Sequence, residues 1–346
     1  MNVFSPDYPR AIWECTLNGE PLNSKLAPRL MSLTITEHRG DEADQLSIEL
    51  SDHDGLLEIP PLDAELKVAI GWSHLGLVEK GAYLIDEVTH SGAPDVLTIR
   101  GRSADLSGPL RTRTERSFHK KTIQQIIDEI AIANDLEAVV SPNLAKKVIP
   151  HIDQTNESDA AFLSRLGKRH DAVATVKEGK LLFLLIQGAK KADDQTEMPV
   201  FEIVRKDGDN HSYTQASRDS YTGVKAFWMD TAKAKKQSVV VGVLGNAKHL
   251  RETYATESDA LDAAKAEWQR IRRGQASMVF DLAIARPELT PQCMIQFKDM
   301  KEPINSERWL IKQLTHRLDA SGGLTTKMEL ETEGAEDPEA ITSNEV

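Results

Sequence analysis

The sequence predicts an α+β fold that is mainly β, in which two similar small β-barrel-like domains flank a mixed α/β module. Three observations predict it. Short β-branched segments bounded by turn residues fill the beginning of the chain, a helical period appears after residue 110, and strand-like segments return towards the end. The chain has 346 residues, enough for two or three domains of ~100–200 residues each.

Residues 1–110 are predicted to form the first β-domain. Segments such as 46–50, 83–88 and 96–100 are short, rich in aliphatic residues and separated by residues that favour turns. The clearest hairpin turn is at 89–95, where Gly and Pro occupy positions that a chain reversal needs.

Residues 111–221 are predicted to form a middle module of helices and a hairpin. Thr122 and Gln125 have the spacing of a capping box, and a second helix is expected after Ser158. The first of these helices would bury one apolar face, formed at spacings of three and four by Ile123, Ile126, Ile127 and Ile130.

Residues 222–332 are predicted to form the second β-domain, which includes strands at 223–229 and 238–243 and a helix opening at Ser258. The end of the chain, 333–346, is expected to be a disordered acidic tail. From residue 331 onward there are six acidic residues and no Lys or Arg, and few large apolar side chains that could pack.

An internal echo indicates that the two β-domains are related. Residues 83–90 match 309–316 at an offset of 226, with four identities in eight positions. Both segments lead into a turn that contains Gly, and a Leu-Thr pair follows at 97–98 and 324–325, an offset of 227. Residues 63–70 and 292–299 are comparable strands upstream. Chance similarity between two hairpins is the alternative, and duplication is the favoured interpretation.

Composition argues against several classes of protein. The net charge of -12 gives no overall positive field, so nucleic acid is a poor candidate ligand. The longest apolar runs have six residues, too few for a membrane-spanning helix, and the first residues do not resemble a secretory signal, so we expect synthesis and folding in the cytoplasm. Cys15 and Cys293 are expected to be free thiols.

No motif predicts a catalytic, cofactor-binding or metal site, so we expect none. Asp52–Gly55 lacks the third oxygen ligand and the Glu of a calcium loop, which favours an acidic turn, and Gly242–Gly245 lacks the Lys of a phosphate loop. His90 and His316 end equivalent strands, and a shared structural contact is the favoured interpretation. The five Trp residues are expected to pack in cores.

The strongest charge cluster is Arg111–Lys121, with five positive residues and one negative. It has two possible interpretations: a docking strip for an acidic protein surface, or a solvated linker that enters a helix. The linker is favoured.

The order of these parts resembles the late control protein D family, the baseplate hub proteins of contractile-tailed phages, over nearly all of residues 1–332. The resemblance depends on the order and spacing of degenerate motifs: the basic segment, Thr122-Ile123-x-x-Ile126-Ile127-x-x-Ile130, Ser158-x-x-x-Phe162-Leu163-x-x-Leu166, the hairpin at 177–181, Trp309-Leu310-Ile311 and Leu324-Thr325-Thr326.

This resemblance implies a non-enzymatic structural protein without cofactors. In such a family two tube-like β-domains per chain form a homotrimeric, pseudo-six-fold ring that adapts the hexameric tail tube to a trimeric spike, here expected to be a separate polypeptide. The implied partners are further copies of the chain, the tube protein, the spike protein and other baseplate proteins, with neither specific nucleic-acid binding nor membrane insertion. The implied location is the virion baseplate, assembled in the host cytoplasm.

Two alternatives remain open from the sequence. The chain could be a hub-associated peptidoglycan hydrolase with a cleft in residues 111–220, or a hub or adaptor of a bacterial contractile secretion system. A domesticated prophage device cannot be separated from a phage by sequence.

Overall fold

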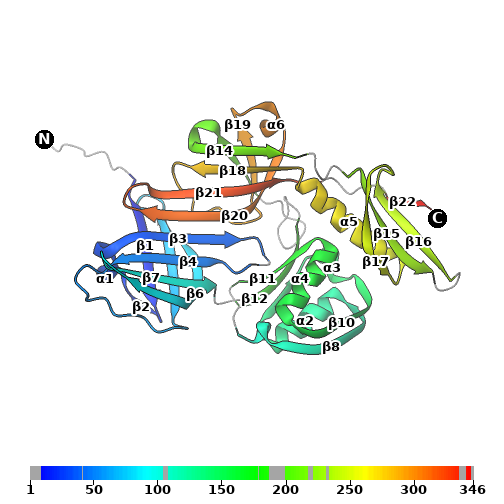
Figure 1. The fold of residues 1–346 in the computed structure, drawn as a ribbon, viewed down its shortest axis with the longest axis horizontal. Coiled ribbons are helices and arrows are strands. Elements are labelled where there is room, and N and C mark those ends of the chain that lie inside the picture. The colour runs from blue at the N-terminus through cyan, green and yellow to red at the C-terminus, as the bar shows by residue number, and fades with distance from the viewer. Residues whose placement is uncertain are drawn as a thin grey trace.

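The computed structural model describes residues 9–40, 42–103, 108–177, 179–186, 199–216, 221–230, 234–334 and 340–343. They form an elongated molecule in which the first β-domain and a small sheet lie at opposite ends (Figure 1). No helix in these ranges is long and apolar enough to cross a bilayer. The fold is mainly β, as predicted, and one sheet of thirteen strands dominates it.

The first β-domain contains the strands that the alternating apolar pattern predicted. Inward positions such as Leu46, Ile48 and Leu50 are buried, and the intervening residues are not. A short helix α1 (Asn23–Leu26) and a 3₁₀ turn η1 (Ala27–Arg29) precede the central strands. The strands are β1 (Ala11–Leu17), β2 (Glu20–Pro21), β3 (Leu30–His38), β4 (Gln45–Ser51), β5 (Glu65–Trp72), β6 (Gly76–Ser91) and β7 (Val96–Ser103).

The second β-domain packs Phe280, Phe297 and Trp309 in its core. It contains two short helical segments, η4 (Arg205–Asp207) and α6 (Glu302–Asn305). Its strands are β13 (Val200–Val204), β14 (Gly208–Gln215), β18 (Ala276–Leu282), β19 (Met294–Lys298), β20 (Arg308–Asp319) and β21 (Gly323–Thr332).

Strands β13 and β14 differ from the predicted division, which placed residues up to 221 in the middle module. They lie in the large sheet instead, where β13 pairs with β19 and β14 with β18. Their local sequence is polar and turn-rich, and sheet partners that lie about 60 to 95 positions later in the chain cannot be read from it.

The two β-domains have the same strand order. In the first domain the order is β3-β4-β7-β6-β5-β1, and in the second it is β14-β18-β21-β20-β19-β13. The corresponding strands also follow one another in the same sequence order, from β1 to β7 in the first domain and from β13 to β21 in the second. One orientation differs: β1 is antiparallel to β5, whereas β13 is parallel to β19. A common strand order is what duplication requires.

Irregularities in the two domains coincide as well. A β-bulge at Asp86 in β6 corresponds to one at Lys312 in β20, at the offset of 226. Asp63 and Gln292 both have positive φ, at 62° and 73°, and each donates its backbone N–H to the residue before that bulge. Bulges are local features that chance similarity between strands would not reproduce at matching positions.

The hairpin that follows corrects one detail of the predicted echo. The sequence pattern matches Leu97–Thr98 with Leu324–Thr325, which gives an offset of 227. The register pairs Ile85 with Gly101 and Ile311 with Leu330, which sets the offset of β7 and β21 at 229. The second hairpin is longer because its ladder continues to Asp319.

The middle module has its own apolar core and follows the predicted helices closely. Thr122 and Gln125 form the capping box of α2 (Ile123–Ala133), and Ser158 caps α4 (Asp159–His170). The remaining elements are η3 (Gly108–Arg111), β8 (Arg113–Thr122), β9 (Glu137–Val140), α3 (Pro142–Ala145), β10 (Val148–Ser158), β11 (Ala172–Lys177) and β12 (Lys180–Leu185).

A separate unit interrupts the second β-domain between β14 and β18. Its strands were predicted to belong to that domain, but they form a sheet of four with its own core, packed against a helix. That helix begins after Thr256, two residues before the predicted Ser258, because the Thr256 hydroxyl caps it. The unit contains β15 (Gly223–Asp230), β16 (Lys235–Gly242), β17 (Ala247–Tyr254) and α5 (Glu257–Arg273).

The acidic end of the chain also differs in part from the prediction of disorder. Residues 340–343 form β22 (Ala340–Ser343), which pairs with β16. Residues 335–339 and 344–346, for which disorder was also predicted, lie outside the described residues.

Candidate functional site

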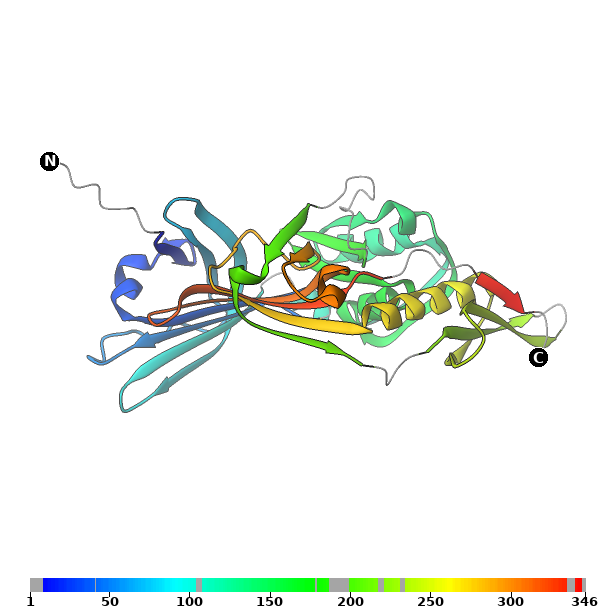
Figure 2. The same ribbon diagram turned by 90° about the horizontal axis from the view of Figure 1, so that it is seen from above.

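The candidate functional site is the junction where the two β-domains, the middle module and helix α5 meet. The β-domains join through one strand pair, in which β3 adds antiparallel to β20 from Gln313 opposite His38 to Asp319 opposite Ser32. Figure 2 shows the large sheet continuing from one domain into the other. The bulge at Lys312 divides this edge of β20, because β19 pairs with its first residues and β3 with the rest.

A buried polar cluster lies beneath that strand pair. Glu37 of β3 accepts hydrogen bonds from Lys80 of β6 at 2.8 Å and from Nε2 of His316 in β20 at 3.2 Å. The other ring nitrogen of His316 lies 2.8 Å from the hydroxyl of Thr326. All four side chains are buried, so the cluster connects the two domains by fully desolvated polar contacts.

The electrostatics of the cluster keep Glu37 charged. Burial alone would raise its pKa, but the hydrogen bond from His316 and the positive charge of Lys80 outweigh this and lower the pKa of Glu37 to about 2. For His316 burial is the dominant effect and lowers its pKa, so the ring is neutral at pH 7. A neutral His316 ring that donates a hydrogen bond to a charged Glu37 is consistent with the lowered pKa of each side chain.

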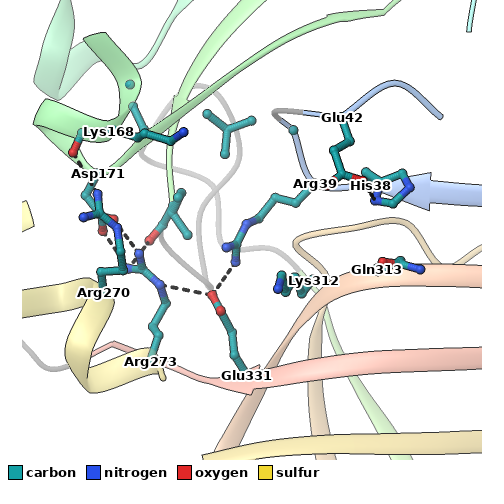
Figure 3. A pocket seen from close by; sticks show the side chains of 15 residues that line it. His38, Arg39, Glu42, Lys168, Asp171, Arg270, Arg273, Lys312, Gln313 and Glu331 are labelled. Carbon is teal, nitrogen blue, oxygen red and sulfur yellow. Dashed lines mark hydrogen bonds and ion pairs between the residues drawn. The ribbon is translucent and has the colours of Figure 1, made fainter. Parts of the chain in front are cut away.

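A chain of charged residues crosses the junction beside this cluster (Figure 3). Arg39 of the first β-domain contacts Glu331 of β21, and Glu331 accepts from Nε of Arg273 at 3.1 Å. Arg273, the last residue of α5, also binds Asp171 through both terminal nitrogens, one of them at 2.6 Å. Each of these four residues belongs to a different part of the molecule.

Asp171 reaches Arg273 because of its backbone conformation. It ends helix α4 in the left-handed region, with φ of 52°, and the chain then turns into β11. Burial lowers the pKa of Arg273, but the hydrogen bonds and charge of Asp171 and the charge of Glu331 outweigh it, and the pKa is raised. The guanidinium therefore stays charged inside the junction.

A pocket of about 420 Å³ opens between these elements. Arg39 and Arg273 line it, and both are neutralised by the carboxylates of Glu331 and Asp171. Arg270 is bound to the carbonyl of Lys168 at 2.9 Å and to Glu267. The ion pairs are internal, so the arrangement fixes the domains relative to one another.

Close packing holds the middle module against the first β-domain. A Cβ atom on Gly40 would lie 2.2 Å from a methyl carbon of Val173, so a larger residue at position 40 would require Val173 to shift. Lys177 pairs with Asp44 at 3.5 Å nearby. The module is also tied to the inserted unit, where Arg169 contacts Asp259 at 2.8 Å.

The two histidines at equivalent positions of the repeat lie in different environments. His90 and His316 occupy equivalent positions, but His90 is 39% exposed and contacts Asp52 at 3.2 Å, whereas His316 is fully buried. They therefore do not share the contact that was predicted. The difference arises because β3 covers His316 and no described strand covers His90.

The other motifs lie in structural positions. Asp52–Gly55 is a turn in which Arg29 pairs with Asp54 at 2.5 Å, and Gly242 ends a strand. In the described part of the chain, no group of three or more His, Cys, Asp or Glu side chains is arranged to hold a metal ion. Burial raises the pKa of the Cys15 thiol to about 12, which makes it a poor nucleophile, and Cys293 is buried too.

Most of the basic cluster Arg111–Lys121 lies in strand β8, which begins at Arg113, and this differs from the favoured linker. Phe118 is fully buried against Phe162 of α4, with ring centroids 5.4 Å apart, and β8 pairs with β10 in an antiparallel ladder. Arg116 pairs with the buried carboxylate of Asp159 at 3.1 Å. The docking interpretation stays a prediction for the side chains that remain exposed.

Sequence reasoning missed the residues that join the domains, among them Glu37, Lys80, Arg39 and Arg273. One signal was available for Glu37, since it continues the inward alternation of Leu33 and Ile35 in β3. A carboxylate at an inward position needs a buried partner, although the alternation does not say which one.

The chain is similar to phage tail proteins both in sequence and in fold. Residues 46–322 match a family model described as "Phage tail baseplate hub (GPD)". The probable baseplate hub proteins of Escherichia phages 186 and P2 are 40% and 39% identical, over 91% and 95% of this chain and 91% and 94% of theirs. A solved structure, the 43 kDa tail protein of prophage MuSo2 from Shewanella oneidensis, is 14% identical, has a TM-score of 0.71 and aligns with 92% of this chain and 98% of its own.

Proposed function

Since this chain belongs to the phage tail baseplate hub (GPD) family, we propose that it forms a homotrimeric ring that joins the hexameric tube of a contractile tail to a trimeric spike. A hub is located in the tail baseplate of the virion. We further propose that the ring assembles in the host cytoplasm and that its partners are the tube protein, the spike protein and other baseplate proteins.

The single observation that supports this proposal is the duplicated β-domain. Two domains with the same strand order and matching bulges at Asp86 and Lys312 lie in each chain. Three chains arranged around one axis would present six similar domains to a six-fold partner, while the assembly as a whole keeps three-fold symmetry. That is the geometry an adaptor between a hexamer and a trimer requires.

We propose that the hub acts without catalysis. Its relatives are named for a structural position in the tail. The buried charges at the domain junction are paired internally, Glu37 with Lys80 and Arg273 with Asp171. We propose that these buried ion pairs fix one arrangement of the parts of the chain. A zymogram on peptidoglycan tests the hydrolase alternative, and a lytic band abolished by replacing one carboxylate would overturn the structural role.

A reconstruction of the tail by electron cryo-microscopy tests the proposed assembly. The expected result is a three-fold ring of this chain, with six similar β-domains, located between the tube and the spike. A ring of six chains, or a position outside the tube axis, would contradict it. Because the curated relatives are phage proteins, this experiment is best done on the phage tail.

A further inference from the structure

The two edges that join the β-domains are not equivalent edges of the two domains. The first domain contributes β3, and the second contributes the later part of β20. Because the domains are equivalent, each contains both kinds of edge: β14 corresponds to β3, and β6 corresponds to β20. The strand pair within one chain therefore uses β3 and β20 and leaves the equivalent edges of β14 and β6 unused.

The correspondence of β3 and β14 holds at the level of single residues. Each strand has a bulge against its neighbour, at Met31 in β3 and at Asp209 in β14, which sets an offset of 178. With this offset Thr36 corresponds to Thr214 and Glu37 to Gln215. For β20 and β6 the matching bulges give the offset of 226.

The two leftover edges are open in the part of the chain that the structure describes. Strand β14 pairs with β18 alone, and residues 87–91 of β6 pair with β7 alone, since β5 accompanies β6 only from Gly76 to Leu84. The exposure of the side chains also differs between the joined edges and the open ones. Glu37 and His316 are buried at the joined edges, whereas their counterparts Gln215 and His90 are exposed.

We propose that these edges join one chain to the next in the ring: β14 of one copy adds antiparallel to residues 87–91 of β6 in a second copy. The inference rests on the proposed homotrimer and specifies its contact. Such a contact is head-to-tail, and a head-to-tail contact closes a ring when its rotation permits. Three contacts within chains and three between them would then alternate around six domains.

The contact within the chain fixes the register of the proposed one. His316 lies opposite Ile35 and Thr315 opposite Thr36. The two offsets turn these pairs into His90 opposite Tyr213 and Thr89 opposite Thr214. The threonine pair is thus retained, and a cross-strand pair of β-branched residues suits a sheet.

Hydrogen bonding shows which backbone groups would take part. The backbone N–H of Arg39 donates to the carbonyl of Lys312, so alternate residues of β3, including Glu37, face β20. On β14 the N–H of Ala216 donates towards β18 instead, to Gln275. The N–H of Gln215 therefore points outward, towards the proposed partner, and Thr89 and Thr214 form a non-hydrogen-bonded pair.

Disulfide trapping tests the register. Non-hydrogen-bonded pairs have Cβ atoms ~4.5–5.5 Å apart, and a disulfide draws them slightly closer. The variant Thr89→Cys/Thr214→Cys is expected to give linked dimers and trimers on a non-reducing gel, since each chain would offer one cysteine to each neighbour. Native Cys15 and Cys293 are buried, and the two single variants control for them. The variant His90→Cys/Thr214→Cys, whose cysteines would lie on opposite faces, is the matched negative control.

A second variant tests the edge without a cross-link. Proline is tolerated in an edge strand where its missing N–H faces solvent. Gln215→Pro is therefore expected to leave the monomer folded, by circular dichroism, and to reduce trimer at least tenfold relative to Gln215→Ala. If the wild type is trimeric but Thr89→Cys/Thr214→Cys forms no cross-link, or if Gln215→Pro leaves the trimer unaffected, this contact is overturned and the proposed function still stands. A wild type that stays monomeric even with its spike would overturn the proposed function and this contact together.

Discussion

Asp86 and Lys312 occupy the same position in two halves of one chain: each is the extra residue of a β-bulge in the long strand of its β-domain. Each bulge stands where the strand's first partner along one edge ends, β5 beside β6 and β19 beside β20. In β20 the new partner is β3, whereas the corresponding part of β6 has no second partner among the described strands. The irregularity is thus part of how the domains are joined.

Arg273 is expected to be the most important charged residue at the junction. Replacing it by Met would leave the buried carboxylate of Asp171 without its ion-pair partner and would remove one of the two arginines that contact Glu331. Removing one partner of a buried ion pair costs ~3–5 kcal/mol. Urea denaturation of Arg273→Met should show a loss of this size. The control is Lys298→Ala, which breaks an exposed pair with Glu202 and should cost less than ~1 kcal/mol. Equal losses in the two variants would refute this role.

Glu37 gives the protein a pH-dependent contribution to stability. Its pKa is lowered from 4.5 to about 2, so the folded state binds its proton less tightly than the unfolded state does. The contribution is complete above about pH 4.5 and is lost as the pH falls towards 2. Unfolding midpoints of wild type and Glu37→Gln should therefore differ at pH 7 and converge on acidification. A difference that stays constant from pH 7 to pH 3 would show that the charge of Glu37 is not responsible.

His170 is expected to destabilise the fold in acid. Burial lowers its pKa from 6.5 to about 3, helped by the nearby charges of Lys147 and Arg169, and neither ring nitrogen has a hydrogen-bond partner among the described residues. Folding therefore requires the neutral ring, and stability is lost as the pH falls from 6.5 towards 3, by up to ~1.4 kcal/mol per pH unit. His170→Leu should show a shallower decline of the unfolding free energy over this range, and an unchanged slope would exclude His170 as its source.

Gly40 and Val173 form a steric pair that a double-mutant cycle can test. Gly40→Ala places a carbon 2.2 Å from the Val173 methyl, and overpacking of this kind costs ~1–3 kcal/mol. Val173→Ala removes that methyl at the cost of some burial. The double variant should be more stable than the sum of the single effects predicts. Strict additivity would mean that the clash is relieved elsewhere.

Local signals predicted the elements whose causes are local. The capping box of Thr122 and Gln125 and the apolar face of α2 depend on neighbours within a few residues, and both are present. The echo between β6 and β20 was visible because the same local pattern recurs. The offset of the following strand was not, because hairpin length depends on how far the ladder continues, here to Asp319.

The junction was beyond local signals because its partners come from separate parts of the chain. Glu37 and His316 are 279 positions apart, and Arg273 and Asp171 are 102 apart. Alternation marks Glu37 as inward, but only the three-dimensional fold shows what it meets. The inserted unit of β15–β17 and α5 was missed for a similar reason, since its strands are locally indistinguishable from those of the domain that it interrupts.

In the proposed hub, two equivalent β-domains per chain serve a trimeric ring. The most direct measurement is the mass in solution by light scattering, for the protein alone and after co-purification with its spike. The expected result is a mass near three times 38.4 kDa, or a complex of three chains with three spike chains. A monomer in both preparations would contradict it.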